Sequence, residues 1–328
     1  MEKSDKIYVA GDQGMVGSAI IRLLKSKGYD NIITATRAEL DLTNQQHCSI
    51  FFNNIKPDYV FLCAAKVGGI LANNTQRADF IYENTMITSN VIHSSYLTKV
   101  KKLLYLGSSC IYPKESKQPI SETELLSGYL EPTNEPYALS KILGVKMCES
   151  YNRQYSTNFI SVMPTNLYGY NDSYDKNNSH VFASLIRKFS EAKMMNHKNV
   201  TLWGTGEPER EFLFVDDLAE ALYFLMENYN SNETINVGCG QDISIKDLAY
   251  KIKSIIGYKG DIVFDTSKPD GMKKKLLDVS KINNLGWKFK TDLESGINIT
   301  LDDFEKNYQK YTNSYNYKSM NMKHLDNF

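Results

Sequence analysis

The chain has no excess of charge of either sign, since 38 Lys and Arg side chains balance 38 Asp and Glu side chains. Without net charge or a basic run, there is no electrostatic reason to expect binding to nucleic acid or to an anionic membrane. No apolar stretch approaches the roughly 18 to 20 residues that a membrane-spanning helix needs. The first residues, MEKSDKIYVAG, contain no signal-peptide apolar core. We therefore expect neither nucleic acid nor membrane as a partner.

Cysteine is scarce, and the five cysteines of the 328 residues are scattered: Cys48, Cys63, Cys110, Cys148 and Cys239. None has the spacing of a metal-ligand pair, and a disulfide framework is not expected in a chain of this size. Internal repeats are also absent. These absences predict a soluble, reduced, cytoplasmic protein without a metal site, large enough for one large domain or two modest ones.

The first half of the chain alternates apolar strand-like runs with helical segments. Strands are expected over 6–11, 31–37, 58–65, 102–109 and 159–169, and helices over 14–29, 43–55, about 76–98 and 134–155. The continuous apolar run 58–65 is typical of a parallel strand covered on both faces. This alternation predicts an α/β fold with a doubly wound parallel Rossmann-type sheet.

After about residue 170 the regular alternation ends in a polar loop. Shorter strand and helix signals follow, which predict a smaller α/β C-terminal substrate lobe over 171–310. The dinucleotide-binding domain is then expected over 1–170, with a later segment at about 213–240 returning to it. The last segment, 311–328, has little periodicity and is expected to be a loosely packed extension.

Three glycines, Gly11, Gly14 and Gly17, follow the first predicted strand and open the first predicted helix. Glycines here permit a tight turn and let a pyrophosphate approach backbone N–H groups at the positive end of the helix. Their place in a β-α-β pattern predicts a dinucleotide site. A glycine turn that only packs helix on strand is the alternative.

The end of the second predicted strand indicates which dinucleotide binds. NAD sites commonly have an acidic residue there, which binds the adenosine ribose. This chain has Arg37 instead, and a guanidinium suits a 2′-phosphate. We therefore expect NADPH, with an ordinary surface arginine as the alternative.

Tyr137 and Lys141 lie four residues apart on a predicted helix and so share one face. A nearby ammonium stabilises a tyrosinate, which lets the tyrosine exchange a proton nearer neutral pH. The pair alone is common on helix surfaces. Here it follows Ser108 at the end of the preceding strand, and strand ends in this fold face the ligand crevice. We expect these three residues to converge beside the nicotinamide.

Longer strings resemble the extended short-chain dehydrogenase/reductase family, and within it the epimerase-reductases of GDP-4-keto sugars. These strings are AAKVGGILANNT (64–75), DFIYEN (79–84), LGSSCIYPK (106–114), LEPTNEPYA (130–138), CESYNRQY (148–155), SVMPTNLYG (161–169), NSHV (178–181), KPDG (268–271) and KLLDV (275–279). The resemblance covers about residues 1–305. It implies NADPH-dependent reduction at C4 of a GDP-4-keto-6-deoxymannose-type sugar, coupled to C3/C5 epimerisation, for surface polysaccharide synthesis.

The resemblance also implies roles for five residues. Ser108 would hydrogen-bond the C4 carbonyl oxygen, Tyr137 would protonate that oxygen, and Lys141 would hold the tyrosine and the nicotinamide ribose. Cys110 would remove the protons at C3 and C5, and His180 would return them on the opposite face. A thiolate near a positive nicotinamide suits this role, while an ordinary buried cysteine is the alternative.

Further contacts are implied by the same resemblance. The cofactor would contact Gly11, Gly14, Met15, Val16, Gly17, Arg37, Asp41, Leu42, Ala64, Ala65, Tyr137, Lys141, Pro164, Asn166, Leu167 and His180. The substrate would contact Ser108, Asn166, Lys188, Trp203, Arg210 and Lys275. Arg210 and Lys275 stand where such enzymes hold the diphosphate. Surface or core positions are the alternative for the last four residues.

The chain departs from the family pattern in two places. Asp12 and Gln13 replace a basic residue beside the second glycine, so Arg37 alone would bind a 2′-phosphate. Segments 171–180 and 207–211 differ near the sugar, which leaves a GDP-4-keto-heptose open as the substrate. The main alternative is therefore a C4-reductase that acts on a heptose already epimerised by a separate enzyme.

Two other functions fit the residues less well. A nucleotide-sugar 4,6-dehydratase needs an acidic pair where Ser109 and Cys110 stand here. A regulatory dinucleotide-binding module usually lacks the tyrosine or the lysine, and this chain has both. By analogy with relatives, we expect a homodimer formed through the helix of Tyr137 and Lys141, with a dehydratase upstream.

Overall fold

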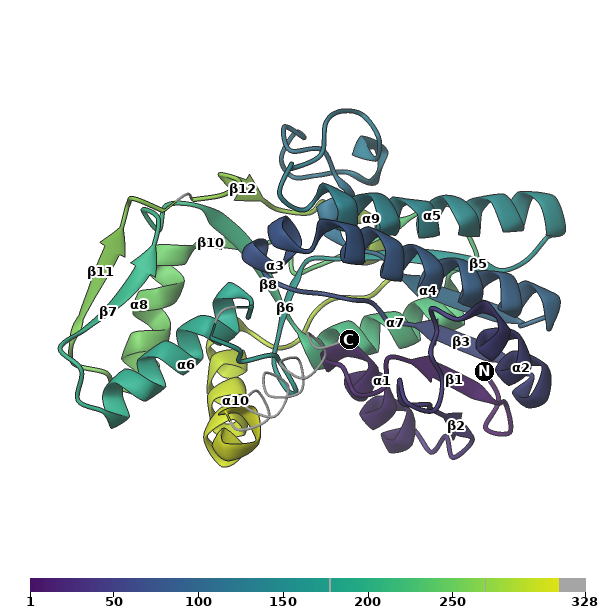
Figure 1. The fold of residues 1–328 in the computed structure, drawn as a ribbon, viewed down its shortest axis with the longest axis horizontal. Coiled ribbons are helices and arrows are strands. Elements are labelled where there is room, and N and C mark those ends of the chain that lie inside the picture. Colours follow the sequence, from purple (N-terminus) through teal and green to yellow (C-terminus); the bar gives the residue numbers. More distant parts are fainter. Residues whose placement is uncertain (177, 269, 313–328) are drawn as a thin grey trace, which may run out of the picture.

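The computed structural model describes residues 1–176, 178–268 and 270–312 (Figure 1). Its largest sheet has the strand order β2–β1–β3–β4–β5–β9, and every neighbouring pair is parallel. The strands are β1 (Ile7–Ala10), β2 (Ile32–Ile33), β3 (Tyr59–Leu62), β4 (Lys102–Leu106), β5 (Phe159–Pro164) and β9 (Ile235–Val237). The predicted doubly wound parallel sheet is confirmed.

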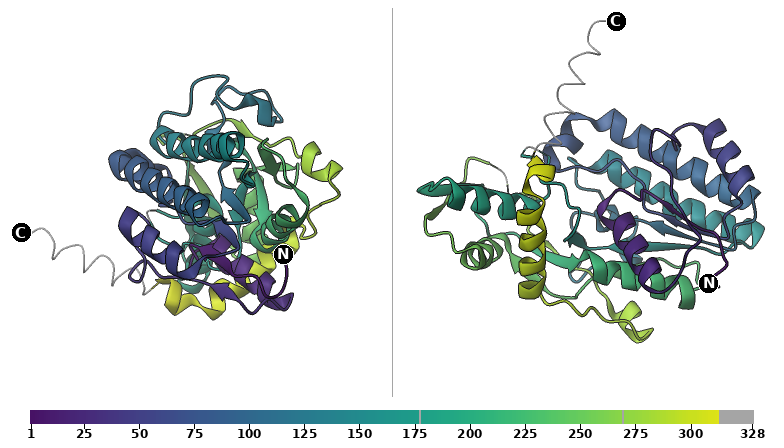
Figure 2. Two further views of the ribbon diagram at one scale, coloured as in Figure 1. Left: turned by 90° about the vertical axis from the view of Figure 1, so that its right-hand side faces the viewer. Right: turned by 90° about the horizontal axis from the view of Figure 1, so that it is seen from below.

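Helices cover both faces of this sheet, and every residue of β1, β4 and β5 is buried. In Figures 1 and 2, α4 and α5 lie side by side on one face, with α2 next to α4, while α1 and α7 cover the other face. The bounds are α1 (Met15–Ser26), α2 (Gln45–Ile55), α4 (Arg77–Leu97), α5 (Glu135–Tyr155) and α7 (Val215–Asn228). The sheet edge at the carboxyl ends of the strands is left for the site.

A second, smaller lobe occupies the left of Figure 1 and confirms the predicted C-terminal α/β lobe. In it, β8 (Glu209–Phe214) pairs with β6 (Asn166–Tyr168), β10 (Asp242–Ser244) and β12 (Lys274–Lys275), and β7 (Asn199–Trp203) pairs with β11 (Asp261–Asp265). The helices α6 (Val181–Met194), α8 (Ile245–Ile256) and α10 (Leu293–Lys306) pack together there. Buried aromatic rings such as Phe182, Phe189 and Phe304 form its core.

The chain crosses between the two lobes several times. The strand predicted over 159–169 is in fact two strands, since β5 lies in the large sheet whereas β6 pairs with β8. The break falls at Thr165, whose N–H donates to Val237 and whose hydroxyl donates to Glu211. Later in the chain, Leu277 and Ile282 are buried in the core of the first lobe. Crossings of this kind bring residues distant in sequence to one site.

Other predicted bounds differ for local reasons. The strand expected over 31–37 is only β2, because the Glu39 carboxylate accepts two hydrogen bonds from Thr36 and forms a turn. The strand expected over 102–109 ends at Leu106, where the turn η1 (Ser109–Ile111) follows. The remaining short helices are α3 (Ile70–Thr75), η2 (Glu122–Glu124) and α9 (Ser280–Asn284).

Most of the predicted tail, residues 313–328, lies outside the described residues. The predicted tail begins at Tyr311, which is described and is buried. Its ring packs against the rings of Tyr174 and Phe304, so this end of the tail does not extend loosely. Among the described helices, none combines the length and apolar character needed to cross a membrane.

Candidate active site and cofactor loop

The loop between β1 and α1 fits a pyrophosphate group. Gly11 has φ of +88°, which favours glycine, and a Cβ there would lie 2.8 Å from the backbone nitrogen of Ala64. A Cβ on Gly17 would overlap the carbonyl oxygen of Gly11. Gly14 precedes α1, and no side chain caps the first amides of this helix. The uncapped N–H groups and the close backbone approach form a cradle for an anion.

Arg37, the residue expected to bind a 2′-phosphate, is already engaged. Its side chain is 75% exposed, and its Nη2 lies 3.2 Å from the carboxylate of Glu83 on α4. The same carboxylate lies 2.9 Å from Nζ of Lys66, in the loop after β3. Glu83 therefore joins two cations near the predicted ribose site, a connection that the sequence did not indicate.

The predicted contacts Asp41 and Leu42 stabilise the turn before α2. The Asp41 carboxylate accepts hydrogen bonds from the hydroxyl and the N–H of Thr43, and these bonds lower its pKa. The Leu42 carbonyl accepts a hydrogen bond from Asn90 on α4. The remaining predicted cofactor contacts lie at strand ends or helix starts: Met15 and Val16 in the first turn of α1, Ala64 and Ala65 after β3, and Pro164, Asn166 and Leu167 at the junction of β5 and β6.

Ser108, Tyr137 and Lys141 come together where β4 ends and α5 begins. The Ser108 hydroxyl accepts a hydrogen bond from the Cys110 N–H at 3.2 Å and also hydrogen-bonds the Tyr137 side chain. Lys141 is 3% exposed, and its Nζ donates to the Leu106 carbonyl at 2.7 Å. The same Nζ lies 5.9 Å from the centroid of the Tyr137 ring. The structure thus brings all three predicted reductase residues into one place.

The electrostatics of this group differ from the expectation that the ammonium would lower the tyrosine pKa. Burial, followed by the Cys110 charge, raises the pKa of Tyr137 above its usual value, and the hydrogen bond with Ser108 only partly opposes this. Burial lowers the pKa of Lys141 to about 8. A low-dielectric site disfavours both charged forms, and Lys141 donates to a carbonyl instead of the phenol. Tyr137 is therefore a protonated hydroxyl at neutral pH.

Cys110 lies beside two cations. Lys275 Nζ donates a hydrogen bond to Cys110 Sγ at 3.2 Å. Burial raises the pKa of the Cys110 thiol, but the Lys275 charge and the hydrogen bonds with Ser108 and Lys275 outweigh burial and lower this pKa overall. Arg210, in register with Lys275 on the neighbouring strand, also interacts electrostatically with the thiol. A thiol in such an electropositive place is a reactive one.

His180 stands immediately before α6, in a segment that docks on the loop after β3. The Gly69 N–H donates to the Asn178 carbonyl at 3.1 Å. The His180 side chain keeps exposed surface, yet neighbouring atoms desolvate its imidazole and lower its pKa, and the Lys275 charge acts in the same direction. Lys275 therefore acts electrostatically on both Cys110 and His180.

The other predicted substrate residues lie in the second lobe. Lys188 on α6 donates to the Thr201 carbonyl at 3.1 Å, and burial lowers its pKa. Trp203 at the end of β7 is 63% exposed, and Lys268 lies 5.6 Å from its ring centroid.

A cavity of about 490 Å³ is lined by residues of the loop 113–132. It contains none of the predicted site residues, so we do not place the chemistry there.

Sequence reasoning missed Glu211, which is fully buried on β8. Its carboxylate accepts hydrogen bonds from the N–H groups of Gly240 at 2.6 Å and Leu277 at 3.0 Å. Its backbone carbonyl accepts a hydrogen bond from Asn166, a predicted contact of both ligands. Burial raises the Glu211 pKa, and these backbone bonds oppose the rise. No signal in the sequence indicated this role, because Glu211 directly follows two charged residues, Glu209 and Arg210.

Comparison with known proteins identifies close relatives over nearly the whole chain. Putative GDP-L-fucose synthase 2 of Arabidopsis thaliana is 54% identical over 307 residues, which cover 94% of each chain. GDP-L-fucose synthase of Escherichia coli (strain K12) is 50% identical over 315 residues, which cover 93% of this chain and 98% of the relative. Residues 7–238 match the model of the NAD dependent epimerase/dehydratase family.

Solved structures agree with this assignment. A GDP-6-OMe-4-keto-L-xylo-heptose reductase from C. jejuni has a TM-score of 0.90 and 41% identity, with 93% of this chain and 99% of that chain covered. MlghC, a GDP-mannoheptose C4 reductase from Campylobacter jejuni with NADP bound, has a TM-score of 0.86 and 43% identity, with the same coverage. The predicted resemblance to extended short-chain dehydrogenases/reductases is confirmed. The chain belongs to the NAD dependent epimerase/dehydratase family.

Proposed function

We propose that the protein is an NADPH-dependent epimerase-reductase that makes a GDP-linked sugar from a GDP-4-keto-6-deoxymannose-type substrate, as a GDP-L-fucose synthase does. One observation carries this proposal: Cys110, with its lowered thiol pKa, lies in the same site as Ser108, Tyr137 and Lys141. The names of relatives at 50% and 54% identity support this sugar. Residues 1–170 would mainly bind the cofactor and residues 171–310 mainly the substrate.

The fit of the loop after β1 supports a dinucleotide cofactor. Gly11, Gly14 and Gly17 with the start of α1 would hold the pyrophosphate, Arg37 the 2′-phosphate, and Lys141 the nicotinamide ribose. When bound, NADPH supplies the hydride for the C4 carbon. The structures of relatives solved with NADP or NADPH support this choice of cofactor.

In the reduction, Ser108 and Tyr137 act on the C4 carbonyl oxygen. The Ser108 hydroxyl donates a hydrogen bond to this oxygen and polarises the carbonyl. Tyr137 is protonated at neutral pH, so it can give its proton to the oxygen as the C4 alcohol forms. The Lys141 ammonium then stabilises the tyrosinate until solvent returns the proton.

In the epimerisation, the C4 ketone acidifies the neighbouring protons by stabilising an enolate. The Cys110 thiolate takes a proton from C3 or C5 and becomes a thiol, and the C–H electron pair enters the enolate. His180 gives a proton to the opposite face from its imidazolium form, which its lowered pKa makes a stronger acid, and this restores the ketone with inverted configuration. The thiol proton exchanges with solvent and the imidazole regains one, so no net proton is consumed.

A C4-reductase for a GDP-4-keto-heptose is the second candidate function. The observation that favours it is the similarity to heptose reductases, which reaches a TM-score of 0.90. Such an enzyme needs Ser108, Tyr137 and Lys141 but not Cys110 or His180. A dehydratase would work upstream, and a separate epimerase would invert the sugar before reduction.

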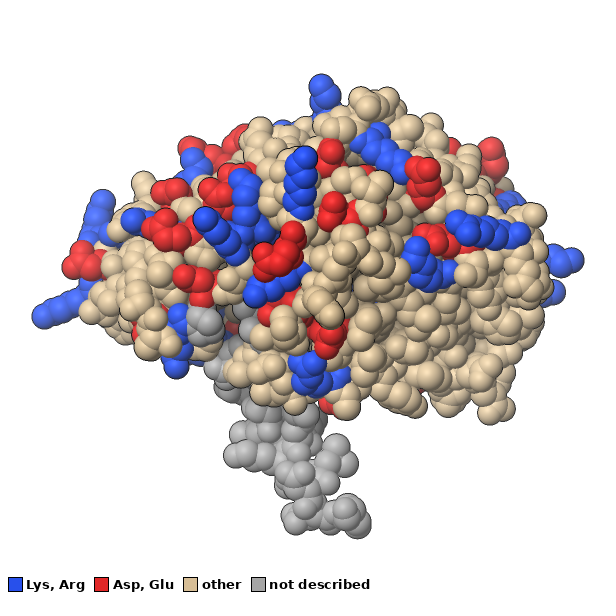
Figure 3. Space-filling view, turned by 90° about the horizontal axis from the view of Figure 1, so that it is seen from above, with Lys and Arg blue, Asp and Glu red and all other residues tan. Residues whose placement is uncertain are grey.

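A cytoplasmic homodimer that serves surface polysaccharide synthesis completes the proposal. Helix α4 carries no Lys, Arg, Asp or Glu from residue 84 to its end. Large apolar side chains are exposed on α4 and α5: Tyr82, Leu97, Leu139 and Tyr155. Figure 3 shows a broad area with few charges over the half of the molecule that holds these helices. Such a face suits a symmetric contact between copies.

The test is the reaction in D2O with NADPH and either GDP-4-keto-6-deoxymannose or the corresponding GDP-4-keto-heptose, followed by NMR and mass of the product. We expect deuterium at both C3 and C5 of a reduced 6-deoxyhexose. Reduction of the heptose alone, without deuterium at these carbons, would instead assign the C4-reductase. A Cys110→Ser variant should lose the deuterium yet still reduce a ketone that is already epimerised.

A further inference from the structure

The ammonium of Lys275 is buried against a thiol instead of a carboxylate. Lys275 is 7% exposed, and its Nζ lies 3.2 Å from Cys110 Sγ. Over residues 1–176, 178–268 and 270–312, this sulfur is the single hydrogen-bond partner found for the ammonium. A neutral thiol is a weak acceptor, whereas a thiolate compensates a buried ammonium. The burial of Lys275 is therefore best satisfied when Cys110 is ionised.

The neighbouring residue Lys274 shows what a structural lysine looks like at the same place. Its Nζ lies 2.9 Å from Glu209 and 2.6 Å from Asp242, so two carboxylates neutralise it. Successive residues of a strand point to opposite faces, which separates the two lysines of β12. Of these two lysines, Lys275 reaches the thiol. The parallel pairing of β12 with β8 sets Lys275 in register with Arg210.

Every element around the thiol contributes a polar or charged group. Ser108 from the turn after β4, Lys275 from β12 and Arg210 from β8 favour the thiolate. Glu131, from the segment before α5, opposes it. The remaining neighbours are Tyr137 on α5 and His180 before α6. The Cys110 charge helps to raise the pKa of Tyr137, and the Lys275 charge helps to lower the pKa of His180.

We propose that Lys275 is a positioning residue that holds Cys110 as a thiolate aimed at the substrate for C3/C5 proton transfer. This proposal rests on the epimerase activity proposed above. Lys275 transfers no proton and forms no covalent bond. When the thiolate takes a proton from carbon, the Lys275 charge remains beside the new enolate and offsets its negative charge. Hydride delivery at C4 and protonation by Tyr137 do not use this pair.

The first test measures the thiol itself, without substrate. Alkylation of Cys110 by iodoacetamide is followed against pH by mass spectrometry in the full chain. The variants are Lys275→Met, Lys275→Arg and, as the matched control, Lys274→Met. We expect wild type and Lys274→Met to show a midpoint below the usual thiol value of about 8.5. Lys275→Met should move the midpoint upward and slow alkylation at pH 7 at least about tenfold.

Lys275→Arg keeps the charge and should keep the low midpoint, which separates loss of charge from a folding defect. If Lys275→Met is poorly folded by circular dichroism, a charge effect would still appear as thiolate absorbance near 240 nm that differs between wild type and Cys110→Ser at neutral pH. An unchanged alkylation midpoint in folded Lys275→Met, or no such absorbance difference, would overturn the proposal.

The second test connects the thiol to the reaction. In D2O with NADPH and the GDP-4-keto sugar, the ratio of C3/C5 deuterium incorporation to C4 reduction should fall at least about tenfold in Lys275→Met. The same ratio should stay unchanged in Lys274→Met. A wild-type enzyme with a low alkylation midpoint but no deuterium incorporation would disprove the epimerase function and with it the catalytic part of this proposal. The Lys275–Cys110 ion pair itself would remain.

Discussion

Strand β4 meets a buried lysine at each of its two ends. At its start, Lys102 is 4% exposed, and burial lowers its pKa to about 8. At its end, the Leu106 carbonyl accepts a hydrogen bond from Lys141, which is 3% exposed and whose pKa burial also lowers to about 8. A perturbed lysine pKa therefore does not by itself distinguish a functional site from a structural one in this protein.

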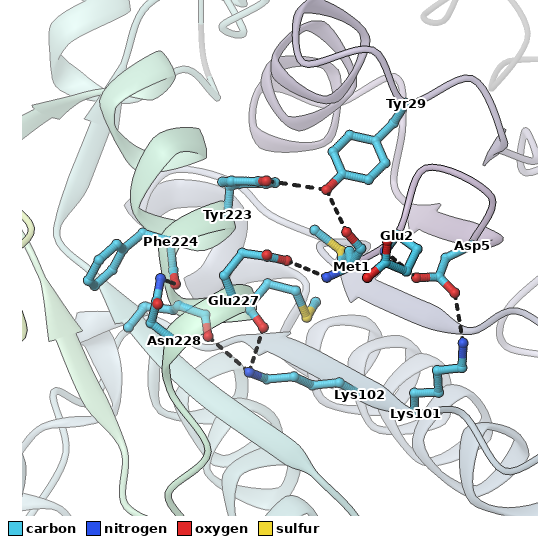
Figure 4. A network of polar contacts seen from close by, with 12 residues as sticks. Met1, Glu2, Asp5, Tyr29, Lys101, Lys102, Tyr223, Phe224, Glu227 and Asn228 are labelled. Atoms are coloured by element: carbon cyan, nitrogen blue, oxygen red, sulfur yellow. Dashed lines mark hydrogen bonds and ion pairs between the residues drawn. The ribbon is translucent and has the colours of Figure 1, made fainter.

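The two lysines differ in how many of their donors are used. Lys102 Nζ donates to the carbonyls of Leu225 and Met226 and to the Asn230 side chain, so its three N–H groups have three acceptors. Both carbonyls belong to the last turn of α7, so Lys102 satisfies acceptors at the end of this helix. Figure 4 shows the surrounding network, in which the Met1 amine pairs with Glu227. Within the described residues, Lys141 has a single hydrogen-bond acceptor, and its remaining donors are free for ligand and tyrosine.

The largest expected effect is on turnover. Lys141→Met should lower kcat for reduction of the GDP-4-keto sugar at least about 100-fold, because the tyrosinate and the nicotinamide ribose lose their cation. Lys102→Met should change kcat less than about threefold. NADPH oxidation at 340 nm measures both. Comparable losses of kcat in the two variants would contradict the assignment of Lys141 as a functional lysine and Lys102 as a structural one.

The next effect concerns stability against pH, and here the two lysines should behave alike. Each folded pKa is about 8, below the unfolded value of about 10.4. Between these pH values the unfolded chain holds a proton that the folded chain lacks, so the contribution of each lysine to stability rises with pH. Each lysine should contribute about 1 to 3 kcal/mol of this rise.

Urea unfolding at pH 7.5 and pH 10 tests this prediction. Lys102→Met and Lys141→Met should each lack the contribution of the substituted lysine to the change in unfolding free energy between these pH values. Only Lys141→Met should also lose activity. The comparison of slopes within one variant removes the constant cost of the lost hydrogen bonds. A change in unfolding free energy between the two pH values that is the same in both variants as in the wild type would contradict the lowered pKa values.

A smaller effect is expected where the site meets the adenosine ribose. Arg37→Ala should raise KM for NADPH about tenfold and change KM for NADH little, since a charged hydrogen bond to phosphate is lost. Glu83→Gln should lower KM for NADPH a few-fold, because Arg37 and Lys66 lose their carboxylate partner. Steady-state kinetics with both cofactors measures this, and equal changes for NADH and NADPH would remove Arg37 from the 2′-phosphate site.

The smallest effect is expected beside Lys102, at Lys101. Its ammonium lies 2.7 Å from Asp5 and 2.9 Å from Asp58, and these carboxylates raise its pKa. Because the Lys101 side chain is 54% exposed, solvent screens the pair. Lys101→Met should cost less than about 1 kcal/mol of unfolding free energy and leave kcat unchanged. Thermal unfolding checks this, and a larger loss would mean that the amino end of the sheet depends on its ion pairs.

Local patterns in the sequence were sufficient for part of this description. The glycine loop and the Tyr137–Lys141 pair were readable because turn geometry and the helical repeat depend only on neighbouring residues. The break between β5 and β6 was not predicted, because 159–169 was interpreted as one continuous strand. Thr165 breaks it through hydrogen bonds to Val237 and Glu211, which lie far along the chain.

The sequence by itself determined the parallel α/β fold, the family and the chemical types of the site residues, since these follow from periodicity, spacing and long shared strings. Only the tertiary structure decided which groups face one another. Lys275 was expected beside a diphosphate, and the structure places its ammonium on Cys110, 165 residues away. Arg37 likewise meets Glu83 on α4. Such partners depend on strand register and on the packing of distant segments, and no local pattern encodes either.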